Sequence, residues 1–170
     1  HHDHFFNYDS QINSMNSVKV GPHKDILALW KAAADKFNMP FGISEHLGAS
    51  FSWWRVNKGC DSYGPYAGTP YDGNDPAYAD FYYANQEHGT NNPHDCSPWY
   101  TTNKDFQAYW LRCVNEMIER FQPDLLYTDG SLPFGDHWWG KDNSAIDDTS
   151  YTIGLQAVAN LYNTSISKHG

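Results

Sequence analysis

Residues 122–130 read Gln-Pro-Asp-Leu-Leu-Tyr-Thr-Asp-Gly, and this stretch decides the fold class. A short apolar run follows Pro123, and it ends on the carboxylate of Asp129 and on Gly130. An apolar segment that turns abruptly polar is typical of a buried parallel strand whose last residues face a site. We therefore expect a buried strand over 124–128, with the Asp129 carboxylate at its carboxyl end.

A second segment has the same pattern, because residues 41–46 read Phe-Gly-Ile-Ser-Glu-His. Apolar residues at three- and four-residue spacing predict helices over 22–38, 103–121 and 150–165. Pro22 suits the first turn of the first helix, Asp25 its positive end, and Asn103 the N-cap of the second. The expected apolar faces are Ile26, Leu29, Trp30, Ala33 and Phe37; then Phe106, Tyr109, Trp110, Cys113, Met117, Ile118 and Phe121; then Ile153, Val158, Ala159 and Leu161.

The order helix, strand, long loop, helix, strand, loop, helix predicts parallel α/β packing. We expect residues 1–170 to be one partial catalytic domain of a (β/α)₈ TIM-like barrel, with a long loop insertion at about 48–104. A complete barrel needs about 250 residues, so this chain would supply only part of one. The alternative is a small doubly wound sheet, but the GxGxxG and P-loop motifs that mark many such sheets are absent.

Composition excludes several classes of protein. The 170 residues carry 11 basic and 20 acidic side chains, and this acid excess argues against nucleic-acid binding. A mean hydropathy of −0.70 and the lack of an apolar run of about 20 residues argue against a membrane protein. With 16% aromatic and 18% charged residues, disorder is not expected either. The aromatic surplus fits a packed core and a site for polar, ring-shaped ligands equally well.

Cysteines and a glycosylation motif bear on the compartment. Three cysteines are too few for a disulfide scaffold; Cys60 and Cys96 lie in loop-like segments and could pair, whereas Cys113 is expected in the core. The sequon Asn163-Thr164-Ser165 favours a secreted, lysosomal or periplasmic protein. The first residues, His1 to Phe6, contain no signal peptide, and we expect a fragment of a longer protein.

Three polar clusters lie at the expected strand ends, at 1–4, 44–46 and 128–130. In a barrel they would converge at one face. Asp129 would sit in low dielectric, either to do chemistry or to cap a following helix. His1, His2 and His4 could bind zinc with Asp129, or they could be neutral hydrogen-bonding groups in a polar pocket.

Two tryptophans follow the second polar cluster. Trp53 and Trp54 could stack on a sugar or could anchor the long loop by packing. No sequence feature calls for a cofactor.

Two sets of residues resemble a known family. His1-His2-Asp3, followed by Phe5, Ser10, Asn16 and Gly21-Pro22-His23-Lys24-Asp25, resembles the HHDGF…S…N…GP.RD stretch of the α-L-fucosidases of glycoside hydrolase family 29. Residues 122–130 are very similar to that family's QPDLLWTDG strand. Residues 41–43 occupy the place of the strand between these two motifs, and 151–170 are similar to the helix that follows. The blocks agree in order and spacing.

The resemblance implies a retaining α-L-fucosidase that acts on fucosylated oligosaccharides or glycoconjugates without a cofactor. It implies that Asp129 is the nucleophile and that His1 and His2 bind the fucose hydroxyls. The family commonly has Tyr-Tyr-Ser where this chain has residues 44–46, so Glu45 or His46 could replace a pocket tyrosine.

Such an enzyme needs two carboxyl groups about 5–5.5 Å apart, and in the family the acid/base usually comes from a later loop. Within this chain Glu45 is the fallback. A metal-dependent hydrolase built on His1, His2 and His4 and a non-catalytic fucose-binding relative remain the alternatives. The linkage cleaved and the oligomeric state are left open.

Overall fold

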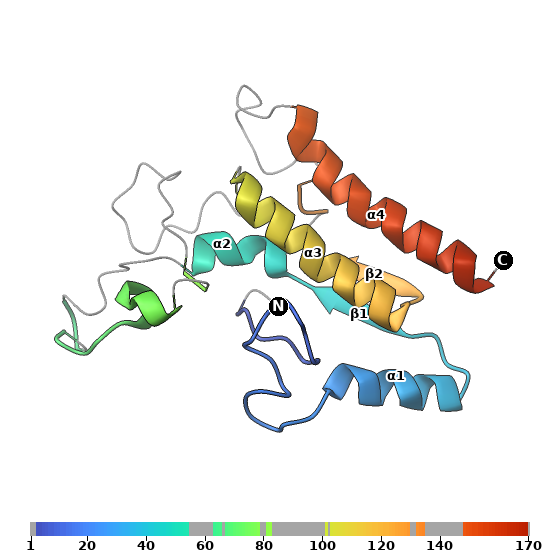
Figure 1. The fold of residues 1–170 in the computed structure, drawn as a ribbon, viewed down its shortest axis with the longest axis horizontal. Coiled ribbons are helices and arrows are strands. Elements are labelled where there is room, and N and C mark those ends of the chain that lie inside the picture. Colours follow the sequence, from blue (N-terminus) through green and yellow to red (C-terminus); the bar gives the residue numbers. More distant parts are fainter. Residues whose placement is uncertain are drawn as a thin grey trace.

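The structure of the chain is a computed structural model that describes residues 3–54, 63–65, 67–78, 81–82, 101, 103–129, 132–134 and 148–169. Its elements follow the order α1, β1, η1, α2, η2, η3, α3, β2, α4. Among these residues, no helix is long and apolar enough to cross a membrane. The expected alternation of helices with strands is present (Figure 1).

The two predicted strands pair with each other. β1 (Gly42–Glu45) and β2 (Leu125–Thr128) form a parallel two-stranded sheet in which Gly42 lies opposite Leu125 and Glu45 opposite Thr128. A parallel pair needs a long crossover connection, and here the crossover includes α3. Because the strands are parallel and in register, their carboxyl ends meet at one edge, as the sequence predicts.

Helix α3 (Lys104–Phe121) supplies more of the described core than any other element. Its N-terminus is capped by Asn103, whose side chain accepts a hydrogen bond from the Phe106 backbone N–H at 2.9 Å. Gln122 ends it in the left-handed conformation, at φ 45°, and Pro123 cannot continue a helix. The expected stripe is confirmed: Phe106, Trp110, Cys113, Met117, Ile118 and Phe121 are buried, Val114 joins them, and Tyr109 is partly buried. Burial raises the pKa of the free Cys113 thiol to about 12.

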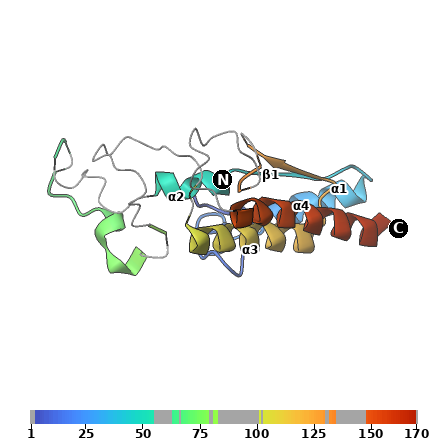
Figure 2. The ribbon, with the colours of Figure 1, turned by 90° about the horizontal axis from the view of Figure 1, so that it is seen from above.

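The sheet has one covered face and one open face. Ile43 and Glu45 of β1 are buried toward α3, and Figure 2 shows the strands on one side of that helix. The opposite face, with Gly42, Ser44 and Tyr127, is exposed. The expectation of a buried 124–128 strand is therefore wrong: Leu125 and Tyr127 are 61% and 53% exposed, and Leu126 and Thr128 are only partly buried. The described residues place no second layer over this face.

Helix α1 (Ile26–Lys36) begins four residues later than the periodicity predicts. Pro22 is not in its first turn, and Asp25 is its N-cap, accepting from the Ala28 N–H at 2.8 Å. The expected apolar face is mostly uncovered, with Trp30 62% and Phe37 68% exposed. Periodicity identified residues that share a face, but among the described residues no other element packs closely over it.

Helix α4 (Asp148–His169) packs along α3 and extends beyond the expected 150–165. Ile153 and Leu161 pack against the core as predicted. Ala159 is exposed, and the alanine buried in the interface is Ala157. The sequon residue Asn163 is on an exposed part of this helix.

The long segment expected at 48–104 contains short helical turns where it is described. They are η1 (Leu47–Ala49), α2 (Ser50–Trp53), η2 (Asp72–Asn74) and η3 (Pro76–Tyr78).

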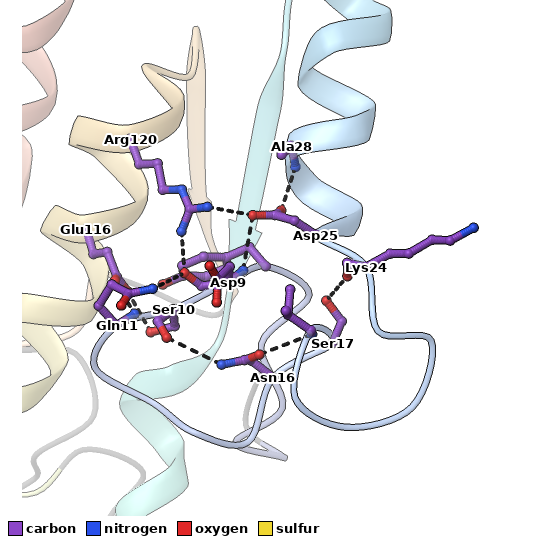
Figure 3. A network of polar contacts seen from close by, with 12 residues as sticks. Asp9, Ser10, Gln11, Asn16, Ser17, Lys24, Asp25, Ala28, Glu116 and Arg120 are labelled. Atoms are coloured by element: carbon purple, nitrogen blue, oxygen red, sulfur yellow. Dashed lines mark hydrogen bonds and ion pairs between the residues drawn. The ribbon is translucent and has the colours of Figure 1, made fainter.

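The N-terminal segment is attached to α3 by polar contacts (Figure 3). Glu116 accepts hydrogen bonds from the Tyr8 hydroxyl at 2.8 Å, the Ser10 hydroxyl at 2.7 Å and the Gln11 backbone N–H at 2.6 Å. One helical turn later, Arg120 donates to the Asp9 carbonyl and pairs with Asp25 at 2.7 Å. We call these contacts of Glu116 and Arg120 the α3 clasp.

Residues 3–24 form turns and bends with one isolated parallel bridge between Phe6 and Asn16. The first polar cluster therefore does not end a regular strand in its described part, Asp3 and His4. The α3 clasp and side-chain hydrogen bonds hold this segment in place instead.

Candidate active site

Asp129 lies at the carboxyl edge of the sheet. It directly follows β2, and its backbone N–H donates to the Glu45 carbonyl at 3.0 Å, which extends the strand pairing by one residue. Its side chain is 51% exposed. Residues 132–134 are not helical, and the next helix in the described part of the chain, α4, begins at Asp148, so Asp129 caps none of the described helices.

His46 lies beside Asp129. It follows β1 and places its Nδ1 atom 3.8 Å from Oδ2 of Asp129. Burial lowers the pKa of the His46 imidazole, and the nearby carboxylate opposes that shift without reversing it. A neutral imidazole can both donate and accept hydrogen bonds, which suits recognition of sugar hydroxyls. The predicted convergence of the second and third polar clusters is thus observed for these two side chains.

Glu45 occupies the other face of the sheet. Its carboxyl group is buried under α3, where Oε2 accepts from the Leu47 N–H at 2.8 Å and from Trp110 Nε1 at 3.4 Å. Burial raises the pKa of this carboxyl group. Successive side chains of a strand point to opposite faces, so Glu45 and the exposed Ser44 lie on opposite faces of the sheet. The structure does not bring the Glu45 carboxyl group into the open face that carries Asp129.

His4 is fully buried, and its tautomer follows from its contacts. The Ser50 hydroxyl donates its one hydrogen to the Leu47 carbonyl at 2.7 Å, so it accepts from His4 Nε2 at 2.7 Å. Nε2 therefore carries the imidazole proton. Burial lowers the pKa of His4 from 6.5 to about 4, which keeps the ring neutral at physiological pH.

Trp54 packs on His4. The two rings are stacked with centroids 5.6 Å apart and an interplanar angle of 19°, and Tyr82 meets the indole edge-on at 5.2 Å. Of the two roles expected for Trp54, these contacts favour the loop anchor over a sugar platform, because His4 covers one face of the indole.

Several predicted site residues lie outside the described part of the chain. They are His1, His2 and the side chain of Trp53, together with Cys60 and Cys96. Among the described residues, no three His, Cys, Asp or Glu side chains gather closely enough to hold a metal ion. The zinc alternative also needs His1 and His2, so it stays a prediction.

Sequence reasoning missed Tyr127. This residue lies two positions before Asp129 on the same face, is 53% exposed, and donates its hydroxyl hydrogen to Asp129 Oδ1 at 3.3 Å. The two-residue alternation of a strand could have indicated it. The open face thus combines a carboxylate, an imidazole and a phenol.

The sequence profile described as alpha-L-fucosidase matches residues 1–165. The chain belongs to the alpha-L-fucosidase family. It is 23% identical over 142 residues to the tissue alpha-L-fucosidase of Rattus norvegicus, a match that covers 83% of this chain and 23% of that protein. The resemblance inferred from the two sets of motifs is therefore confirmed.

The fold agrees with that of a solved member of this family. The crystal structure of the Thermotoga maritima alpha-fucosidase in complex with fucose matches with a TM-score of 0.56 and 18% identity, covering 99% of this chain and 28% of that one. The chain thus spans about a quarter of the length of these relatives. It is a mixed α/β part of a TIM-like barrel, as expected.

Proposed function

We propose that this protein is a retaining α-L-fucosidase in which Asp129 is the nucleophile. The observation that carries the proposal is the position of the Asp129 carboxylate at the carboxyl end of β2, on the open face and next to His46. In barrel enzymes the catalytic residues come from the carboxyl ends of strands. Membership of the alpha-L-fucosidase family and the fucose bound to the Thermotoga maritima relative support a terminal α-L-fucose as the substrate.

The chemistry is a double displacement. An Asp129 oxygen attacks the anomeric carbon, the glycosidic bond breaks, and the leaving oxygen takes a proton from a carboxylic acid. Water then attacks the glycosyl ester and gives a proton back to the same group, which releases fucose and the Asp129 carboxylate. His1, His2 and His46 bind fucose hydroxyls in this proposal, as the motif resemblance implies for the first two.

The acid/base in this scheme is not Glu45. Its carboxyl group is buried under Trp110 on the covered face, whereas Asp129 is half exposed on the other side. A group in that position cannot lie 5–5.5 Å from the nucleophile across a bound sugar, as the retaining mechanism requires. The proposal therefore assigns the acid/base to another carboxylic acid on the open face.

Substitution of the nucleophile tests the proposal. In the protein, Asp129→Asn keeps the side-chain shape, so fucose binding is expected to persist while turnover of an aryl α-L-fucoside falls by about a thousandfold or more. Azide added to Asp129→Gly is expected to restore part of the rate and to yield β-fucosyl azide, because the anion attacks from the vacated side. Near-normal turnover by Asp129→Asn would reject the nucleophile assignment.

Glu45→Gln is the matched control, since it makes a carboxyl-to-amide change at the neighbouring strand end. It is expected to retain turnover within about tenfold, because its group lies on the covered face. A loss as large as that of Asp129→Asn would make Glu45 the acid/base. A rate lost on chelation with EDTA and restored by zinc would instead favour the metal-dependent hydrolase.

A further inference from the structure

Tyr127 combines three properties on the open face. It belongs to the same strand as Leu125 and precedes Asp129 by two residues, so the alternation of side chains puts its ring on the same side as the carboxylate. Its ring is half exposed, so the described core does not require it for packing. Its hydroxyl is nevertheless directed at Asp129 Oδ1, at 3.3 Å.

The two oxygens of Asp129 have different surroundings. A carboxylate has no proton, so the Tyr127 hydroxyl is the donor in its contact with Oδ1. Oδ2 faces His46 Nδ1 at 3.8 Å, which is too long for a hydrogen bond. The phenol thus restrains the rotation of the carboxylate from the Oδ1 side, and Oδ2 lies on the side of His46.

We propose that Tyr127 is a positioning residue for the nucleophile: its hydroxyl holds Oδ1 so that Oδ2 is presented to the anomeric carbon. This inference rests on the proposed function of Asp129. Orientation matters because an attacking atom about 1 Å out of place can cost roughly a hundredfold in rate.

The test begins with Tyr127→Phe, which removes one oxygen atom and keeps the ring. With an aryl α-L-fucoside, kcat is expected to fall ten- to a hundredfold while KM stays within about twofold, because the sugar contacts remain. Tyr162→Phe is the matched control, since Tyr162 is an exposed tyrosine on α4, and it is expected to leave both constants unchanged. Equal melting temperatures would show that both variants fold.

The decisive measurement repeats the substitution without the nucleophile. Azide rescue of Asp129→Gly is compared with azide rescue of the Asp129→Gly, Tyr127→Phe double variant. Because Tyr127 acts through the carboxylate, loss of its hydroxyl is expected to have no effect once the carboxylate is absent. The azide-rescued rates of the single and the double variant should therefore be equal, so the effects of the two substitutions are not additive. A rescued rate that falls by the same factor as kcat would mean that Tyr127 contacts the substrate instead, and the inference would be overturned.

Unchanged kcat in Tyr127→Phe would also overturn it. Failure of the underlying assignment is detected separately, because it appears as turnover by Asp129→Asn with Tyr127 intact. The two proposals can therefore fail independently.

Discussion

His4 adopts a backbone conformation that its residue type seldom takes. Its φ is 61°, in the left-handed region where glycine is favoured. The similar family motif has glycine at this position. Here the side chain offsets the backbone cost, because the imidazole is buried, hydrogen-bonded to Ser50 and stacked on Trp54. His4 thereby connects the N-terminal segment to the residues that follow β1.

Burial of His4 has a consequence for stability. Its pKa is lowered from 6.5 to about 4, so between these pH values the unfolded chain binds a proton that the folded chain does not. The contribution of His4 to stability is therefore fully present above pH 6.5 and is lost as the pH falls toward 4, by up to about 3 kcal/mol. Denaturant unfolding at pH 7, 5.5 and 4 measures this loss.

His4→Asn is the variant that isolates the effect, because asparagine tolerates a positive φ and does not titrate in this range. Its free energy of unfolding is expected to decline less between pH 6.5 and 4 than that of the unchanged protein. His23→Asn, at an exposed histidine with a similar φ, is the control. If the free energy of unfolding falls equally with pH in all three proteins, His4 is not the source of the loss of stability.

At the scale of elements, α3 organises the molecule. Its apolar stripe covers β1, its flank packs against α4, and its exposed edge forms the α3 clasp with the N-terminal segment. The sequence motif near the N-terminus contains Ser10 and Asp25, and both are held by this clasp. Ser10 and Asp25, which lie far from Asp129, thus have a structural role: they hold the N-terminal segment against α3.

Glu116→Gln tests the clasp. The carboxylate accepts three hydrogen bonds, and an amide of the same shape has one accepting oxygen and one donating nitrogen. We expect the free energy of unfolding to fall by about 1–3 kcal/mol. Glu119 lies one turn along α3, and among the described residues it accepts one long hydrogen bond, from Asn160 at 3.3 Å. Glu119→Gln is therefore expected to change the free energy of unfolding by less than about 0.5 kcal/mol. Equal effects of the two substitutions would contradict the role of the clasp.

At the scale of the whole molecule, several large apolar side chains in the described part of the chain are exposed. They include Leu29, Trp30 and Phe37 on or beside α1, Leu125 on β2, and Leu155, Tyr162 and Ile166 on α4. In the relatives, about three-quarters of the chain lies outside the matched region. Extended apolar patches favour association with other protein surfaces.

Residues 1–170 expressed alone are therefore expected to be poorly stable and to self-associate. Exposed strand edges add to this tendency. Sedimentation velocity is expected to show oligomers whose share falls in the Trp30→Lys, Phe37→Lys double variant. The matched control, Lys31→Gln with Asp35→Asn on the same helix, is expected to leave the distribution unchanged. A monomer with a sharp, cooperative thermal transition would contradict the prediction.

The sequence alone determined the order of elements, the parallel pairing of the two strands, the buried stripe of α3 and the position of Asp129 at a strand end. These features follow from periodicity and from abrupt changes between apolar and polar residues, which are local. The first turn of α1 was less predictable, because Asp25 serves as its cap and the four residues before Ile26 remain outside the helix.

Tertiary structure decided which faces are covered. Periodicity shows that Trp30 and Phe37 share a face but not whether anything packs on it, and alternation shows that Glu45 and Ser44 oppose each other but not which of them meets α3. The contact of Tyr127 with Asp129 is local instead, because residues two positions apart in a strand lie on the same face. Burial and contact depend on segments distant in sequence, so only the folded chain distinguishes a buried acid under Trp110 from an exposed one available for chemistry.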